Sequence, residues 1–387
     1  MGLKLAIENF KSIKRLELLL DDLTVLVGPP AAGKSNILDA LAIMGYLHKF
    51  KVLGNEYKNS AVNLEPLWLV ARFRELYQLF RYYELTKTIK LMMSGDVSLS
   101  CEISYVAGAP KILIDGKQLP WDLKTFRNDP MNEVQNFVKT LSSFEARVYG
   151  FDRYGLMSEF YQQPNLPRGL HICLSDLSKS RDTPYNILSE FGWNAPYIVR
   201  RHPNAVNSIN ELLKEYIGER LELKVRRTGE ALVFDGNLEM DAVGVSETVF
   251  RTLYTLLALE SSLFYAKYYG LEKKFVVLLE EPEAHVFPYF LNMLAEHIGK
   301  VVGNVYVVVS THNPLFVSRL QDCVKNLRTY YVYRGVDGST SACMLDVDKM
   351  AKDLATMEDV LLGPPHEVLK RYAVEGVKGA EGRTGAG

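Results

Sequence analysis

A glycine-bounded loop that ends in lysine and serine is the segment of this chain best suited to bind phosphate. It runs through Gly28, Pro29, Pro30, Ala31, Ala32, Gly33, Lys34, Ser35 and Asn36. Glycines let backbone N–H groups turn toward an anion, and the partial positive charge of a helix N-terminus favours phosphate. The loop follows the apolar run Leu23 to Val27 and opens an amphipathic segment, which is the strand, loop and helix context of a P-loop. We therefore expect Lys34 to contact the β- and γ-phosphates of a nucleoside triphosphate and Ser35 to bind Mg²⁺. The alternative is an ordinary glycine-rich turn.

Two carboxylates, Glu280 and Glu281, follow a second apolar run, Phe275 to Leu279. Such an unbroken run is typical of a strand buried on both faces of a parallel sheet, and ligands bind at the carboxyl ends of such strands. We expect Glu280 to bind Mg²⁺, directly or through water. Glu281 leaves the strand in a different direction, so we expect it to polarise the attacking water. The alternative is a solvated acidic turn.

A histidine follows a third apolar run, Val305 to Val309, in the segment Ser310-Thr311-His312-Asn313-Pro314. A lone histidine is often only a structural hydrogen-bonding group. At a strand end beside the P-loop strand, however, its imidazole can donate to a γ-phosphate oxygen or to the lytic water in either protonation state. We therefore expect His312, with Glu281, to be a catalytic residue.

The elements that must position these groups alternate between strands and helices. Leu3 to Phe10 and Ile13 to Leu20 alternate apolar and polar residues and predict a strand pair ahead of the P-loop strand. The buried runs with helical segments between them predict a parallel sheet. The predicted fold class is α/β, a P-loop NTPase with a mostly parallel core sheet, an N-terminal antiparallel strand pair and a large mixed α/β lid insertion.

The predicted domains follow from changes of pattern along the chain. Residues 1–48 and 242–347 form a discontinuous nucleotide-binding core, 49–241 a lid insertion, 348–375 a C-terminal helical region and 376–387 a disordered tail. Within the insertion the patterns predict helices at 71–83 and 132–141 and strands at 97–105, 111–114 and 221–225. Two further strands, 328–334 and 342–346, are expected to close the core.

Composition excludes several classes of protein. The 387 residues include 45 basic and 46 acidic side chains, so nucleic acid could be attracted only by a local patch. The four cysteines are far apart and form no CxxC pair, which argues against a zinc site and a disulfide framework. The N-terminus does not resemble a signal peptide, and no apolar run reaches the roughly 18 residues of a membrane span. We expect a cytoplasmic protein without a membrane partner.

The ordered set of motifs resembles the ABC-class ATPase heads of the RecF, SMC and overcoming-lysogenization-defect (OLD) group of AAA ATPases. The resemblance rests on the P-loop, the strand ending in Glu-Glu-Pro-Glu-Ala-His, the strand ending in Ser-Thr-His-Asn-Pro and the opening Ile7-Glu-Asn-Phe-Lys-Ser-Ile13. It covers about the first fifty residues and 241–334. The insertion shows no sustained heptads, so we expect no long coiled coil. We also expect no fused nuclease domain after His312.

The resemblance implies ATP and Mg²⁺ as cofactors and a homodimer that encloses two ATP molecules. Ser246 and Glu247 would form the signature segment that faces the γ-phosphate of the second subunit, although the usual glycine pair is missing there. The alternative is that Ser246 caps an ordinary core helix. Lys11 and Ser12 would touch the base or ribose, or form an ordinary exposed turn. His285 would lie in the loop that crosses the dimer interface, or would be a solvated histidine at a helix start.

Two functions follow. The first is an ATPase, converting ATP and water to ADP and phosphate, that works as a nucleotide-driven dimerisation switch in DNA repair or phage defence. The alternative is a DNA-binding regulatory module whose ATPase gates a separate partner such as a nuclease. The basic stretches Arg200 to His202 and Lys224 to Arg227 would serve the second function, or be solvated faces. A transporter subunit fits poorly because the insertion is too large.

Overall fold

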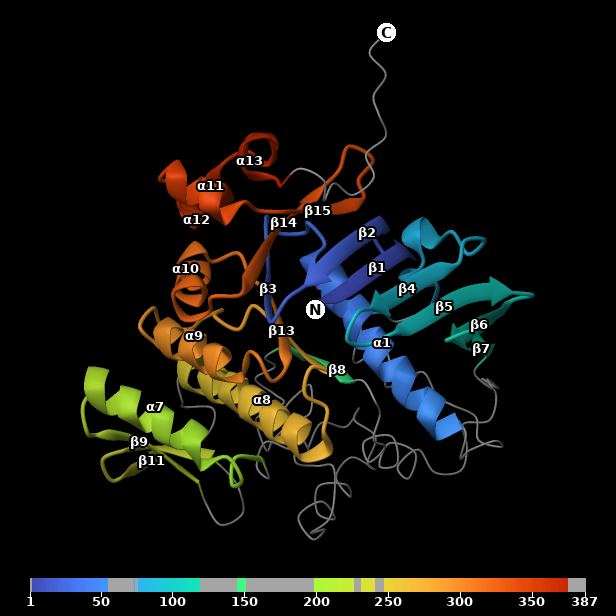
Figure 1. The fold of residues 1–387 in the computed structure, drawn as a ribbon. Coiled ribbons are helices and arrows are strands. Elements are labelled where there is room, and N and C mark those ends of the chain that lie inside the picture. Colours follow the sequence, from blue (N-terminus) through green and yellow to red (C-terminus); the bar gives the residue numbers. More distant parts are fainter. Residues whose placement is uncertain are drawn as a thin grey trace.

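The computed structural model describes residues 2–54, 73, 76–118, 145–150, 198–225, 231–240 and 247–374. Its core is a six-stranded sheet in the order β15-β14-β3-β13-β12-β8 (Figure 1). From β14 to β8 every neighbouring pair is parallel, and β15 pairs with β14 in the antiparallel sense. The strands are β3 Leu23–Val27, β8 Glu145–Gly150, β12 Phe275–Glu280, β13 Tyr306–Ser310, β14 Leu327–Arg334 and β15 Thr340–Met344.

The central strands are buried on both faces, as their unbroken apolar runs predict. Val277 and Leu279 belong to one hydrophobic cluster, with helices on one side of the sheet, whereas Val276 and Leu278 belong to a second cluster on the other side. The helices of the first layer are α8 Glu247–Tyr269, α9 Phe290–Val301 and α10 Pro314–Cys323. The P-loop helix α1, Lys34–Gly54, packs in the second cluster (Figure 1).

A second sheet, entirely antiparallel, covers the other side of α1. Its order is β2-β1-β4-β5-β6-β7. Its strands are β1 Leu3–Phe10, β2 Ile13–Leu20, β4 Ile89–Ser94, β5 Leu99–Val106, β6 Ala109–Ile114 and β7 Lys117–Gln118. The sequence analysis assigns 49–241 to a lid, but this segment contributes strands to both sheets. Strand β4 pairs with β1 in the second sheet, and β8 pairs with β12 in the core sheet.

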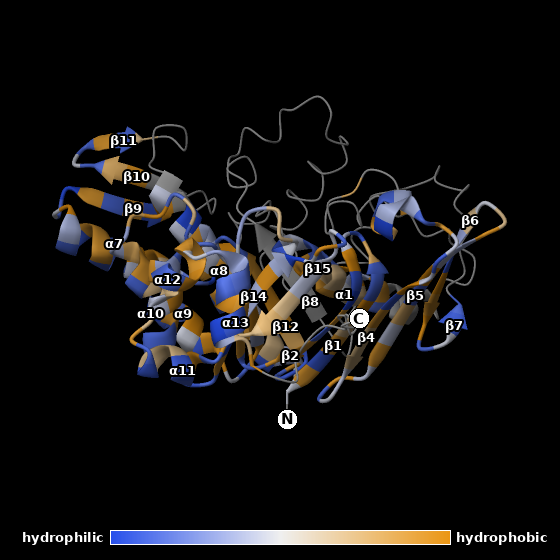
Figure 2. Cartoon of the chain, turned by 90° about the horizontal axis from the view of Figure 1, so that it is seen from above, coloured by the Kyte–Doolittle hydropathy of each residue, from blue (hydrophilic) through white to orange (hydrophobic). Residues whose placement is uncertain are grey.

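The described residues between Pro203 and Met240 form a smaller unit at the far end of the molecule. Helix α7, Pro203–Tyr216, packs on α8 and on a three-stranded sheet. The strands of that sheet are β9 Leu221–Val225, β10 Ala231–Asp235 and β11 Leu238–Met240. Figure 2 shows it at the opposite end from β5, β6 and β7.

One helix expected from the sequence is different in the structure. In the described part of 71–83 the chain forms two short 3-10 turns, Leu76–Leu79 and Arg81–Tyr83. Phe80 between them is extended, and Tyr82 and Tyr83 have positive φ angles, so an α-helix cannot continue there. The helix expected at 132–141 lies outside the described residues.

The C-terminal helical region consists of three short helices, α11 Val347–Lys352, α12 Met357–Leu362 and α13 Pro365–Tyr372. Asp346 caps α11, and Thr356 with Asp359 forms a capping box at α12. The expected tail 376–387 lies outside the described residues. Among the helices that the structure describes, none is long and apolar enough to cross a membrane.

Candidate functional site

The predicted site residues converge at the carboxyl edge of the core sheet. Glu280 at the end of β12 pairs with Ser310 at the end of β13, and Ser310 pairs with Leu26 near the end of β3. Because the three strands are parallel neighbours, the loops that follow them meet at one edge. The P-loop, the segment from Glu280 to Glu283 and the segment from Ser310 to Asn313 are therefore assembled in one place.

The backbone of the P-loop needs its two glycines. Gly28 has a φ of +141°, and a Cβ there would lie 2.1 Å from the backbone oxygen of Val332 on β14. Gly33 has a φ of +105°, and its Cβ would lie 2.0 Å from Oγ1 of Thr340 on β15. Neither position can accept a side chain, because the φ angle is positive and a Cβ would clash with β14 or β15.

The β14–β15 hairpin also clamps the P-loop by hydrogen bonds. Thr340 Oγ1 donates to the backbone oxygen of Ala32 at 2.9 Å, and Arg334 Nε donates to that of Ala31 at 2.9 Å. Sequence analysis misses these two residues because they lie about three hundred positions from the loop they hold and carry no motif of their own.

We expect Gly28→Ala to weaken ATP binding by at least about tenfold, because the added Cβ must push the loop away from β14 and a displaced loop loses its phosphate contacts. A nucleotide titration measures this loss. The matched control is Gly116→Ala, where φ is +73° but nothing lies within 4 Å of the added Cβ. Equal affinities for the two variants would contradict the role of the close approach.

Lys34 is folded back onto the loop that precedes it. Its Nζ donates to the backbone oxygens of Gly28 at 2.7 Å and of Pro29 at 3.0 Å, and the residue is only 7% exposed. Burial lowers the pKa of the ammonium group, while the negative charges of Glu281, Glu283 and Glu280 oppose that shift. A phosphate placed in the loop would offer Lys34 charged acceptors in place of neutral carbonyls, and such contacts are stronger.

The two predicted Mg²⁺ ligands are in contact. Ser35 Oγ donates to Glu280 Oε1 at 2.5 Å, across 245 positions of sequence. Hydroxyl and carboxylate oxygens are ligands that Mg²⁺ prefers, usually with phosphate oxygens and water completing its octahedron. Within the described residues no group of three or more His, Cys, Asp or Glu side chains could hold a metal ion. The donor set fits an ion that is held together with a nucleotide.

The two predicted catalytic residues form a pair. Nδ1 of His312 and Oε1 of Glu281 are 3.1 Å apart, and the side chains are 54% and 41% exposed, respectively. Glu281 has a φ of +43°, an unusual conformation for a residue with a side chain, and its N–H donates to the backbone oxygen of Ser310. The pair is thus open to solvent beside the Mg²⁺ ligands, where a lytic water could reach it.

Lys11, Ser12 and Asn36 bind to other parts of the protein. Lys11 Nζ lies 2.6 Å from the carboxylate of buried Asp39. Asn36 Nδ2 donates to Ser12 Oγ at 2.6 Å, and Ser12 Oγ is 2.7 Å from Thr340 Oγ1. These contacts fasten the β1–β2 turn to the P-loop helix and to the clamping hairpin. Contact of Lys11 and Ser12 with the base or ribose stays a prediction.

The predicted signature segment is only partly described. Ser246 and the side chain of Glu247 lie outside the described residues, and α8 begins at Glu247. One residue further, Thr248 Oγ1 donates to the backbone oxygen of His285 at 2.8 Å. The start of α8 and the segment predicted to cross the dimer interface therefore lie side by side.

Glu283 is a site residue that sequence analysis misses. It is 4% exposed, its Oε1 accepts a hydrogen bond from Thr311 Oγ1, and its Oε2 is buried without a partner among the described residues. Burial raises the pKa of this carboxyl to about 7, and the negative charge of Glu281 adds to the increase. The hydrogen bond from Thr311 and the nearby His312 both act to lower the pKa. The Glu-Glu-Pro-Glu motif contains Glu283, but nothing in the sequence distinguishes a buried carboxyl there from a solvated one.

The raised pKa of Glu283 makes stability depend on pH. The folded state favours the protonated acid, so this contribution is fully present below the ordinary pKa of 4.5 and is lost as pH rises to about 7. We expect Glu283→Gln, which is neutral at every pH, to gain stability over the wild type between pH 5 and pH 8 by up to about 3 kcal/mol. Thermal melts at both pH values measure the gain. The exposed Glu272→Gln serves as control, and a Glu283→Gln gain independent of pH would contradict the shift.

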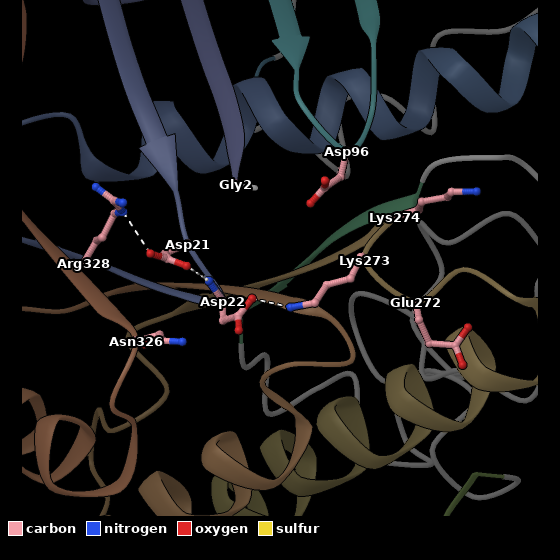
Figure 3. Close-up of a pocket in the computed structure, with 9 residues that line it drawn as sticks. All are labelled: Gly2, Asp21, Asp22, Asp96, Glu272, Lys273, Lys274, Asn326 and Arg328. Atoms are coloured by element: carbon pink, nitrogen blue, oxygen red, sulfur yellow. Dashed lines mark hydrogen bonds and ion pairs between the residues drawn. The ribbon is translucent and has the colours of Figure 1, made fainter.

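A cavity of about 690 Å³ lies at the opposite, amino-terminal edge of the core sheet (Figure 3). Two of its three cationic side chains pair with acids of the same lining: Arg328 with Asp21, and Lys273 with Asp22. Asp96 and Glu272 add further negative charge to the lining, and Lys274 adds one more positive charge. Because its four acids outnumber its three cations, this cavity is not suited to a triphosphate.

Comparison with known proteins agrees with the fold expected from the motifs. Residues 2–94 match the family described as AAA ATPase domain. An SMC head bound to the C-terminal winged-helix domain of ScpA is 14% identical, with a TM-score of 0.51 over 90% of this chain and 98% of that one. The SMC head domain from Thermotoga maritima is 13% identical, with a TM-score of 0.45 over 89% and 100% of the two chains.

The recombination mediator protein RecF, as RecF-ATPrS, is 12% identical, with a TM-score of 0.44 over 88% of this chain and 98% of that one. A comparison with curated proteins finds no match. The chain thus has the α/β fold of an SMC head, which confirms the fold that the resemblance to ABC-class ATPase heads predicted.

Proposed function

We propose that this protein binds ATP with Mg²⁺ and hydrolyses it to ADP and phosphate. The observation that carries the proposal is the contact between Ser35 and Glu280, because two residues 245 positions apart meet where a P-loop would hold the metal of its nucleotide. If the first segment were only a glycine-rich turn and the second only a solvated acidic turn, this contact between Ser35 and Glu280 would not be expected.

Each residue has a chemical task in this proposal. The P-loop N–H groups and Lys34 bind the phosphates, with Lys34 exchanging the carbonyls of Gly28 and Pro29 for phosphate oxygens. Ser35 and Glu280 would hold Mg²⁺, which supplies charge neutralisation at the β- and γ-phosphates. Glu281 orients and polarises the water, and His312 donates a hydrogen bond to the γ-phosphate or to that water.

We further propose that ATP joins two copies of the chain. Glu281 and His312 are about half exposed, whereas phosphoryl transfer is favoured where bulk water is excluded. The second copy would cover the pair with Ser246, Glu247 and His285, as the resemblance implies. The contact between Thr248 and His285 supports this, because it holds both partner-facing segments together in one subunit.

Specific activity as a function of protein concentration tests the proposal. If a second copy completes the site, phosphate release per chain rises with protein concentration and then levels off. Glu281→Gln should release phosphate at least about 100-fold more slowly at every concentration. Release that is absent at every concentration would overturn the ATPase. Release that is present but independent of concentration would overturn only the shared site.

A DNA-binding module that gates a separate partner, such as a nuclease, is the second candidate. Arg200 and Arg201 are exposed just before α7, which favours a small basic surface there. In the second basic stretch, Lys224 on β9 pairs with Glu222, and Arg226 and Arg227 lie outside the described residues. If phosphate contacts are the basis of binding, the affinity for a DNA duplex must fall steeply as salt rises.

A further inference from the structure

A hydrogen bond between two buried side chains ties together the loops that carry Glu281 and His312. The hydroxyl of Thr311, which is fully buried, donates to Oε1 of Glu283, which is 4% exposed. Thr311 immediately precedes His312, and Glu283 follows Glu281 by two positions. The bond therefore lies directly behind the exposed catalytic pair.

Thr311 is itself held firmly. Its N–H donates to the backbone oxygen of Leu26 on the P-loop strand at 3.0 Å, and its Oγ1 accepts from the N–H of Asn313 at 2.9 Å. Asn313 caps helix α10 through the N–H of Phe316. The hydroxyl that contacts Glu283 is thus fixed relative to the P-loop strand and to a helix start.

The segment that contains Glu283 needs such a support. Glu281 and His285 have φ angles of +43° and +58°, a region that costs free energy for residues with side chains. The segment is closed by backbone hydrogen bonds from Ala284 to Glu281 and from Val286 to Glu283. Strained conformations persist only where surrounding contacts hold them in place. The hydrogen bond between Glu283 and the buried Thr311 is one contact that holds this segment to the protein interior.

We propose that Glu283 and Thr311 are positioning residues that hold Glu281 against His312 in the geometry required for hydrolysis. The inference rests on the proposed ATPase function. Neither side chain touches the nucleotide in this account; each acts through the loop that it fixes. The hydrogen bond needs only an acceptor oxygen at position 283 and a hydroxyl at position 311. It therefore does not require the carboxyl of Glu283 to be ionised. Burial of Glu283, which favours the neutral acid, is compatible with this role.

Steady-state kinetics of five variants test the inference: the single variants Thr311→Val, Thr311→Ser, Glu283→Gln and Glu283→Leu, and one double variant. Thr311→Val removes the hydroxyl at nearly constant volume, and we expect kcat to fall about 10- to 100-fold with KM changed less than about threefold, because small displacements of catalytic groups have effects of this size. Thr311→Ser and Glu283→Gln keep the donor and the acceptor, so both should stay within about threefold of the wild type. Thr311→Val combined with Glu283→Leu should be no slower than the slower single variant, because the two residues act as one unit.

Wild-type kcat in Thr311→Val, or a Glu283→Gln variant as slow as Thr311→Val, would overturn the inference. Thermal melts establish that each variant is folded at the assay temperature. A second readout needs no hydrolysis: in ¹⁵N-labelled protein the Nδ1 signal of His312 should move in Thr311→Val and stay in place in Thr311→Ser. If the wild type releases no phosphate, the proposed ATPase function fails. The Nδ1 signal then still tests the positioning role: the same His312 signal in Thr311→Val as in the wild type would overturn that role as well.

Discussion

Lys34→Ala should weaken ATP binding by at least about 100-fold. The Lys34 ammonium is buried among the loop carbonyls and lies near three carboxylates, so it places a positive charge where the β- and γ-phosphates would sit. Two charge-assisted hydrogen bonds at about 1.5 kcal/mol each give roughly 3 kcal/mol, which corresponds to this loss. Isothermal titration with ATP and Mg²⁺ measures it.

The matched control is Lys4→Ala on β1. Lys4 is 55% exposed and pairs with Glu17 at the surface, and a surface ion pair contributes little. We expect this variant to bind ATP as the wild type does. Tight binding by Lys34→Ala would mean that the nucleotide does not occupy the P-loop.

Glu281→Gln should reduce kcat by 100-fold or more while ATP affinity stays within about threefold. A general base or water-orienting carboxylate contributes about 10²- to 10⁴-fold to the rate. Glutamine keeps the volume and can still accept from His312, but it can no longer polarise a water molecule as a carboxylate does. Glu280, not Glu281, contacts Ser35, so binding of the metal and nucleotide should survive. Single-turnover phosphate release together with a nucleotide titration separates the two effects.

Glu272→Gln is the control for that comparison, since Glu272 is exposed at the opposite edge of the sheet (Figure 3). It should hydrolyse ATP at the wild-type rate. A Glu281→Gln variant that loses affinity and turnover equally would show that Glu281 acts in binding and not in the chemical step.

The parts of the site that follow an apolar strand could be predicted from the sequence. The P-loop after β3, the carboxylates after β12 and His312 after β13 each carry a local pattern, and parallel strands must bring their carboxyl ends to one edge. The contact of Ser35 with Glu280 and that of Glu281 with His312 follow from this rule.

The remaining features depend on contacts between distant segments. Thr340 and Arg334 clamp the P-loop from a hairpin three hundred positions away. Glu283 is buried and accepts a hydrogen bond from Thr311 on the neighbouring loop. The alternation of apolar and polar residues indicates strands near β5 and β6, but it does not reveal β4, which pairs with both β1 and β5 and so joins them in one sheet. In each case the partner of an element is decided by tertiary packing.

The mass of Glu281→Gln in solution with saturating ATP and Mg²⁺ tests the central claim most directly, because this variant should bind ATP without consuming it. Light scattering coupled to size exclusion should give twice the mass of the chain with ATP and Mg²⁺, and the mass of one chain with ADP or without nucleotide. A variant that remains at the mass of one chain while ATP is demonstrably bound would contradict the account.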